Sequence, residues 1–259
     1  MDHDLLMIFG VAAAAALASP LGGLAAIVTR PSSLVLSIAV GFAAGVLMGT
    51  FAFEMMPKSL ELASVPLIVA GFLIGLGAVY GLDLYVNRWH MAGNAADEKP
   101  AVDRLHKRRR PRGSGVSVLA GGTSAEEVIE GITIGIGAAF EPKTAVIVAL
   151  AICIDNFSEG MSIGELSLSE TQKNAKWRII GWTSLIGLAV FVAALAGWYF
   201  LSGLSETVIG ILFAAGTGGM FYLTITDLVP EAEAHHFQQS AAIANAAGFL
   251  LMMTLSRMT

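Results

Sequence analysis

A ten-residue pattern of acidic residues and glycines occurs twice in this chain, at 126–135 (EEVIEGITIG) and at 155–164 (DNFSEGMSIG). Each copy has carboxylates at its first and fifth positions, and on an α-helix these two positions lie on the same face. The four residues at these positions are Glu126, Glu130, Asp155 and Glu159. Clustered carboxylate oxygens bind divalent cations and exchange protons, so this face is a candidate cation site.

Both copies lie in apolar surroundings. The chain is 55% hydrophobic and only 14% charged, with a mean hydropathy of +0.71, which indicates an integral membrane protein. A carboxylate at the centre of a bilayer costs about 2.5 to 3.5 kcal/mol even on the lenient insertion scale. Neither copy contains Lys, Arg or His. We therefore expect bound metal, protons or both to neutralise these carboxylates.

Apolar runs long enough to span a bilayer predict the elements that position the site. The chain is predicted to be one all-α, polytopic membrane domain covering residues 1–259. The eight expected helices are 5–28, 33–53, 65–87, 117–140, 144–164, 179–202, 206–228 and 240–256. The fourth and fifth helices carry the two copies and cross the membrane in opposite directions. They are therefore an inverted pair whose acidic faces meet near the middle of the membrane.

The placement of Lys and Arg predicts the orientation. If both termini lie outside, only Lys58, Lys143 and Arg257 of the 15 basic residues fall outside, as the positive-inside rule favours. The segment 88–115 is then a basic cytoplasmic loop between the third and fourth helices. Its run at 107–112 (KRRRPR) is interpreted as a topology signal or a contact with anionic membrane lipid, and no nucleic-acid partner is expected. The predicted location is the cell membrane.

Two further carboxylate and proline motifs lie near helix ends. Glu54 precedes Pro57 in the second helix, and Asp227 precedes Pro230 and Glu231 in the seventh. A proline frees a backbone carbonyl, which beside a carboxylate can face an ion or a water path; a simple kink is the alternative.

A pair of histidines follows the seventh helix. His235 and His236 are candidate exit residues on the predicted cytoplasmic side, and solvated loop histidines are the alternative reading.

Together these motifs resemble those of the ZIP (Zrt/Irt-like) family of divalent metal transporters, over essentially the whole chain. The resemblance implies eight helices with both termini outside, and a homodimer. It also implies a mobile unit of the first, fourth, fifth and sixth helices against a scaffold of the other four. A divalent ion (Zn, Fe, Mn or Cd) is then the substrate, with no organic cofactor. The implied metal ligands are Glu126, Glu127, Glu130, Asp155, Asn156 and Glu159.

The chain departs from the family pattern within the site. Glu126 stands where the family has His, Glu127 where it has Asn, and Ile129 and Ser158 replace two prolines. Carboxylate and amide oxygens favour harder ions such as Mn(II), Fe(II), Mg(II) or Ca(II), although they still permit zinc. Five ionised carboxylates with one divalent ion leave about three negative charges, so we expect metal binding to release protons.

Two other functions compete with transport. A relative of the family that senses metal without transporting it would carry the same ligands. Separately, Gly160-Met-Ser162-Ile-Gly164 resembles the nucleophile motif of rhomboid intramembrane proteases. That reaction requires a His as base, and none of the five histidines lies in a predicted helix. We therefore expect a protein that is not an enzyme.

Overall fold

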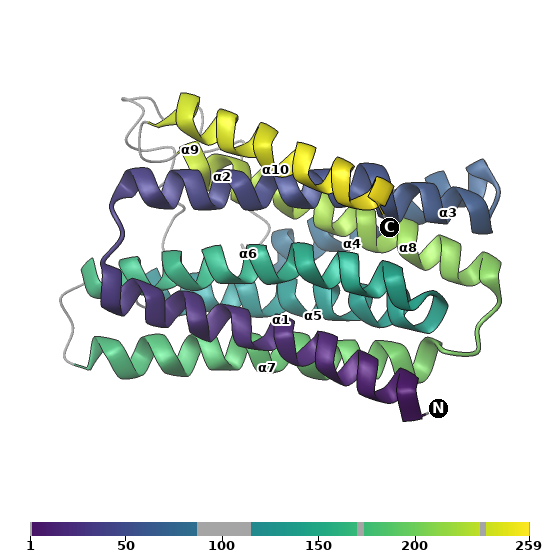
Figure 1. The fold of residues 1–259 in the computed structure, drawn as a ribbon, viewed down its shortest axis with the longest axis horizontal. Coiled ribbons are helices and arrows are strands. Elements are labelled where there is room, and N and C mark those ends of the chain that lie inside the picture. The colour runs from purple at the N-terminus through teal and green to yellow at the C-terminus, as the bar shows by residue number, and fades with distance from the viewer. Residues whose placement is uncertain (1, 87–114, 170–173, 234–236, 259) are drawn as a thin grey trace.

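The computed structural model describes residues 2–86, 115–169, 174–233 and 237–258, and every regular element in these ranges is helical. The basic loop predicted at 88–115 lies almost entirely outside the described residues, as do His235 and His236. The helices run roughly parallel to one long axis (Figure 1). They are α1 Asp2–Thr29, α2 Ser33–Thr50, η1 Phe51–Met55, α3 Met56–Leu62, α4 Val65–Val86, α5 Gly115–Phe140, α6 Pro142–Ser169, α7 Ala175–Leu201, α8 Glu206–Leu223, η4 Thr224–Leu228, α9 Val229–Glu233 and α10 Gln238–Met258.

Two of the membrane-spanning rods contain a π-helical turn. The segments α2, η1 and α3 form one rod over Ser33–Leu62, and α8, η4 and α9 form another over Glu206–Glu233. Each rod passes through its proline and continues beyond the predicted end at residue 53 or 228. Because each rod is continuous, its proline removes one backbone hydrogen bond of the rod, and the π-helical turn lies directly before that position.

Each of the eight predicted spans coincides with one such rod or helix. By length and composition, seven helices of the described chain are apolar enough to cross a membrane. Helix α5 is not one of these seven; it carries Glu126, Glu127 and Glu130. A span with this many carboxylates is sheltered by protein rather than exposed to lipid. The protein is thus an all-α polytopic membrane protein, and the count of eight spans and the side of the termini stay predictions.

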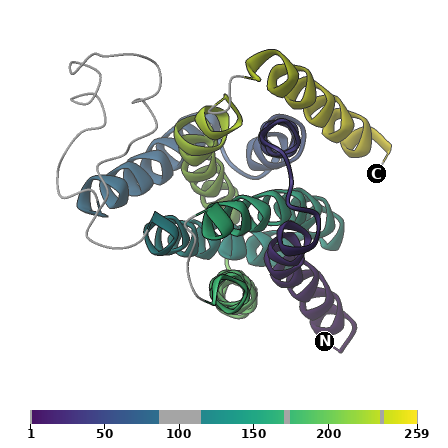
Figure 2. The ribbon, with the colours of Figure 1, turned by 90° about the vertical axis from the view of Figure 1, so that its left-hand side faces the viewer.

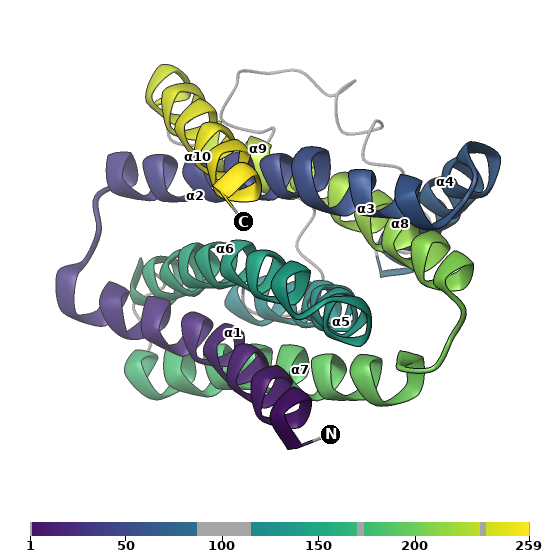
Figure 3. The same cartoon turned by 45° about the vertical axis from the view of Figure 1, so that its right-hand side comes forward.

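The helices pack as two bundles (Figures 1 and 3). The first bundle contains α1, α5, α6 and α7, which pack mainly against one another. The second bundle contains α2, α3, α4, α8, α9 and α10 with the two π-helical turns, and its most extensive contacts are α2 with α10 and α4 with α8. Figure 2 shows the rods end-on, with α2 between α10 and the first bundle. This division matches the two groups of helices that the family resemblance implies.

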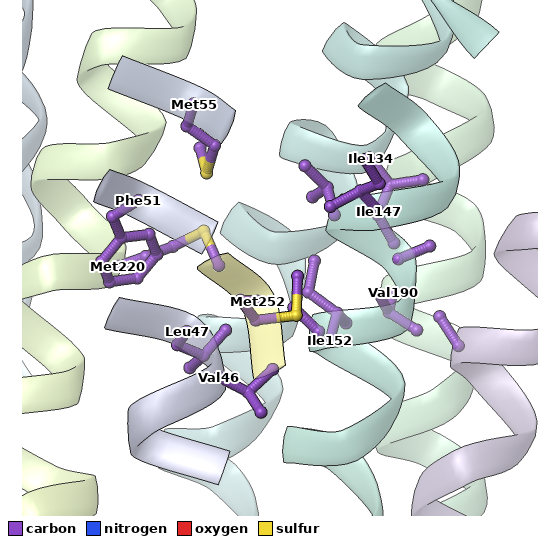
Figure 4. Close-up of a cluster of buried hydrophobic side chains, with 14 of the residues drawn as sticks. Val46, Leu47, Phe51, Met55, Ile134, Ile147, Ile152, Val190, Met220 and Met252 are labelled. Carbon is purple, nitrogen blue, oxygen red and sulfur yellow. The ribbon is translucent and has the colours of Figure 1, made fainter. Parts of the chain in front are cut away.

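An apolar core joins the two bundles. Side chains from α2 and η1, including Leu47, Phe51 and Met55, lie in one buried cluster with Ile152 of α6 and Met220 of α8 (Figure 4). The main contacts between the bundles are made by α2 with α6 and by α5 with α8. The two helices that carry the acidic repeats therefore face the second bundle directly.

Candidate metal site

The second positions of the two acidic repeats meet in the interior. Asn156 Nδ2 donates a hydrogen bond to Glu127 Oε2 at 2.9 Å, and the two residues are 0% and 1% exposed. The same Nδ2 lies 3.5 Å from the backbone oxygen of Ala15 in α1. The amide of Asn156 therefore holds Glu127 in place between α5 and α6.

The fifth position of the first copy meets the first position of the second copy. The carboxyl groups of Glu130 and Asp155 hydrogen-bond to each other, and both residues are buried. One oxygen on each of four side chains in this cluster is buried without a hydrogen-bond partner. These oxygens are Glu127 Oε1, Glu130 Oε2, Asp155 Oδ1 and Asn156 Oδ1. Leaving a buried oxygen without a hydrogen-bond partner costs free energy. A bound cation would supply the missing partner, so these four oxygens are candidate metal ligands.

The remaining two predicted ligands border this cluster. Glu126 and Glu159 are half-buried, and Glu159 interacts electrostatically with Glu126, Glu127, Glu130 and Asp155. The five carboxylates of the two copies therefore influence one another electrostatically, and direct contacts join Glu130 with Asp155 and Glu127 with Asn156. Asp155 also interacts across the bundle interface with Glu231 of α9. The strongest charged neighbours of Glu127, Glu130, Asp155 and Glu159 are other carboxylates, so this region attracts cations.

The side chains of the cluster do not form a finished coordination shell. In the described chain, no three His, Cys, Asp or Glu side chains are gathered closely enough to hold a metal ion. The hydrogen bonds between Asn156 and Glu127 and between Glu130 and Asp155 hold these side chains in two pairs and leave one oxygen of each side chain without a partner. A metal ion held by three or more of these side chains therefore requires them to move closer together.

Glu54 lies apart from this cluster, at the predicted outer end. It is 6% exposed, and its Oε1 accepts a hydrogen bond of 2.8 Å from Thr144 Oγ1 of α6. Its Oε2 lies 3.1 Å from Ser256 Oγ of α10. A cavity of about 390 Å³ opens beside it, between η1, α3, the turn from α5 to α6 and the end of α10. Glu54 therefore joins the two bundles at this end.

An ion pair makes a second connection at the same end. Lys58 Nζ lies 2.9 Å from Glu141 Oε2, in the turn between α5 and α6, and 3.5 Å from Glu61 Oε2. The hydrogen bond from Lys58 holds the pKa of the Glu141 carboxyl below its ordinary value. Sequence reasoning missed this pair and the role of Thr144. The one available signal was the isolated placement of Lys58 among the few basic residues predicted to lie outside.

The backbone carbonyl freed by Pro57 is not open to an ion. Phe53 O, four residues before Pro57, accepts from Ser256 Oγ at 2.7 Å. In the seventh-helix rod, Asp227 lies within η4 and its Oδ2 is 3.3 Å from Thr226 Oγ1. The predicted pathway role of freed carbonyls therefore finds no support at Pro57.

The glycines that flank Ser162 have a packing role. A β-carbon added at Gly160 would overlap the backbone oxygen of Ser19 in α1, and one at Gly164 would overlap the side chain of Ala26. Close approach of α6 to α1 thus accounts for the glycines of this Gly-x-Ser-x-Gly segment without any nucleophile.

Comparison with known proteins agrees with this architecture. Residues 108–256 match the family model described as "ZIP Zinc transporter". The chain is also similar to proteins named "Zinc transporter ZupT" from Salmonella heidelberg (strain SL476), Salmonella enteritidis PT4 (strain P125109) and Salmonella typhimurium (strain LT2). It is 28% identical to each of them over 211 residues, which cover 79% of this chain and 77% of each relative. The matched family segment spans more than half of the chain and includes both acidic repeats, so the protein belongs to the ZIP zinc transporter family.

Proposed function

We propose that this protein carries a divalent metal ion across the membrane into the cytoplasm, and that the two acidic repeats bind the ion during transport. Membership of a transporter family supports a carrier over an enzyme. The observation that carries the site assignment is the set of four buried oxygens without partners, on Glu127, Glu130, Asp155 and Asn156. They come from both repeats and lie where the strongest charged neighbours are negative.

The ligand set favours ions that accept oxygen donors. All six proposed ligands, Glu126, Glu127, Glu130, Asp155, Asn156 and Glu159, offer carboxylate or amide oxygen, and none offers imidazole or thiolate. Zinc binds such ligands, and the relatives are named as zinc transporters, so zinc is a candidate substrate. Iron and manganese fit the same donors, and cadmium is a useful probe.

The division into two bundles supports transport by alternating access. The proposed ligands lie in α5 and α6 of the first bundle, against the second bundle. Rocking or sliding of one bundle against the other would expose the site to one side of the membrane at a time. The contacts at Glu54 and Lys58 close the predicted outer end, so they must break when the site opens outward. Asp227 and Glu231 lie on the second bundle as candidate pathway residues, and a homodimer is proposed from the family resemblance.

Metal uptake into proteoliposomes tests this proposal. Purified protein is reconstituted, and uptake of Zn(II), Mn(II), Fe(II), Cd(II) and Mg(II) is compared for the wild type and a Glu130→Ala/Glu159→Ala double variant. We expect the double variant to lose at least about 90% of uptake, because two of five carboxylates in one cluster act as a unit. The matched control is Glu206→Gln, which alters an exposed carboxylate at the start of α8 and should leave uptake unchanged.

A binding measurement separates a carrier from a sensor. Equilibrium metal binding to the detergent-solubilised wild type is measured beside uptake. Binding without uptake would contradict the carrier and favour the sensing relative. Uptake that survives the double variant would leave the carrier standing but refute the acidic repeats as its site.

A further inference from the structure

Each acidic repeat contains a hydroxyl on the same helix face as its carboxylates. The first, fifth and eighth positions of a copy lie on one side of a helix, and the eighth position is Thr133 in the first copy and Ser162 in the second. The two hydroxyls therefore occupy equivalent places, one turn beyond Glu130 and Glu159. Their surroundings differ.

The hydroxyl of Thr133 is hydrogen-bonded within its own helix. It is 0% exposed, and its Oγ1 donates to the backbone oxygen of Ile129 at 2.8 Å. Gly216 of α8 packs against the same hydroxyl, since a β-carbon added there would lie 2.8 Å from Thr133 Oγ1. The hydrogen of this hydroxyl thus has a partner, and Gly216 of α8 covers its oxygen.

Ser162 has no such partner. It is 8% exposed, and its Oγ is buried without a hydrogen bond, which is an unfavourable state for a hydroxyl. Gly160 and Gly164 pack on α1, and Ser162 lies two residues from each, so its side chain leaves the opposite side of α6. That side also carries Asp155, which interacts with Glu231 of the second bundle. The unpartnered hydroxyl therefore belongs to the face of α6 that carries the acidic site.

We infer that Ser162 Oγ is a further oxygen ligand for the transported divalent ion, one turn on the cytoplasmic side of Glu159. This inference rests on the proposed function and extends its site. A rise of roughly 4.5 Å separates the two residues along the helix, a step that an ion keeping part of its water shell can bridge. A neutral hydroxyl binds the ion weakly, so it accepts the ion from the carboxylates without trapping it. It also adds an oxygen donor to the set that selects the metal.

A change of ligand type at Ser162 tests the inference. The Ser162→Cys variant replaces oxygen with sulfur at nearly the same size, in a Cys153→Ala background that removes the native thiol. Because thiolate favours soft ions, we expect the ratio of Cd(II) to Mn(II) uptake to rise by about tenfold or more. Thr133→Cys in the same background is the matched control and should leave the ratio unchanged.

Two further measurements keep the test decisive. The purified Ser162→Cys variant should show a thiolate-to-cadmium charge-transfer absorption band on addition of Cd(II), and the Thr133→Cys variant should not; this readout does not depend on transport. Ser162→Ala should raise the KM for Mn(II) by about threefold or more, and Ser162→Thr should restore it because the hydroxyl returns.

The outcomes for the inference and for the proposed function are distinct. The ligand role of Ser162 is refuted if Ser162→Cys gives neither the band nor a changed metal ratio while it remains monodisperse, or if both cysteine variants behave alike. By contrast, failure of the wild type to transport any metal would refute the proposed function and leave the absorption test of Ser162 intact.

Discussion

The contacts within each bundle differ in kind from the contacts between the two bundles. Within a bundle, glycines bring backbones together: added β-carbons would overlap the backbone oxygen of Asn245 at Gly45, that of Ala215 at Gly75 and that of Ala16 at Gly187. Across the interface, the described glycines meet only side chains of the other bundle, as at Gly216 with Thr133. Backbone packing fixes the bundles internally, whereas a side-chain interface can slip and re-form.

The comparison gives the proposed alternating access a physical basis. Helices without a hydrophobic driving force between them associate through close packing of small residues, and this packing resists rearrangement. The interface that would move under this proposal instead has an apolar core and a few polar connections at its predicted outer end. Variants inside a bundle should therefore affect stability, and variants between the bundles should affect transport.

The largest expected effect is at a glycine inside the second bundle. Gly75→Ala would place a methyl group against the backbone oxygen of Ala215, and we expect it to destabilise the protein by about 2 to 3 kcal/mol. Gly77→Ala, in the same helix, is the matched control, because no atom lies within 4 Å of its added β-carbon. Thermal unfolding of both variants in detergent measures the difference. Equal stabilities would contradict the claim that backbone contact holds the bundle together.

A smaller effect is expected at the polar connection between the bundles. Thr144→Val removes the hydrogen bond of 2.8 Å from α6 to Glu54, and we expect uptake to change by about twofold to fivefold with little change in unfolding temperature. Ser256→Ala removes a contact within the second bundle and should lower stability by about 1 kcal/mol while uptake stays the same. The distinction between interfaces fails if the two variants exchange these effects.

The smallest effect is expected at the ion pair between Lys58 and Glu141. Both side chains are partly exposed, at 26% and 35%, so the pair contributes at most about 1 kcal/mol. We expect Lys58→Gln and Glu141→Gln each to alter uptake by less than about twofold, and the exchanged double variant Lys58→Glu/Glu141→Lys to recover the wild-type rate at low salt. Uptake rates at low and at high salt provide the measurement.

The ion pair between Lys58 and Glu141 should keep its charge over a defined pH range. The pKa of Glu141 is lowered by Lys58, so its stabilising effect is present above the ordinary glutamate value of about 4.3 and is lost only as pH falls through the lowered pKa. Between about pH 5 and 8 the pair stays charged. If uptake depends on pH in that range in the wild type, and equally in Glu141→Gln, then groups other than Glu141 release or bind the protons.

The spacing of residues along each helix was enough to predict which side chains share a face, but it did not predict how the two helices pair. Helical periodicity predicted that both repeats offer carboxylates from one face, and the structure pairs Glu127 with Asn156 and Glu130 with Asp155. The pairing of Glu127 with Asn156, and of Glu130 with Asp155, depends on the relative offset of α5 and α6. That offset is set by tertiary packing, and no pattern within a single helix encodes it.

Helix ends were less predictable for a similar reason. The runs of apolar residues placed the helices correctly, but the second and seventh were expected to stop at residues 53 and 228. The structure continues them to Leu62 and Glu233 through π-helical turns. Ser256, about 200 positions later in the chain, satisfies the carbonyl of Phe53 that Pro57 leaves open. Helix propensity depends on neighbouring residues, so it cannot predict a hydrogen-bond partner so remote in sequence.

The π-helical turns also bear on how the chain tolerates insertions and deletions. At Phe51–Met55 and Thr224–Leu228, the amide after each turn bonds to a carbonyl five residues back, to Phe51 O and to Thr224 O. Each turn thus contains one residue more than an α-helical turn. Loss of one residue there would restore α-helical spacing and keep the faces on both sides aligned. The same loss in the middle of α2 would rotate every later face by about 100°. Length variation among related chains should therefore concentrate at these two turns.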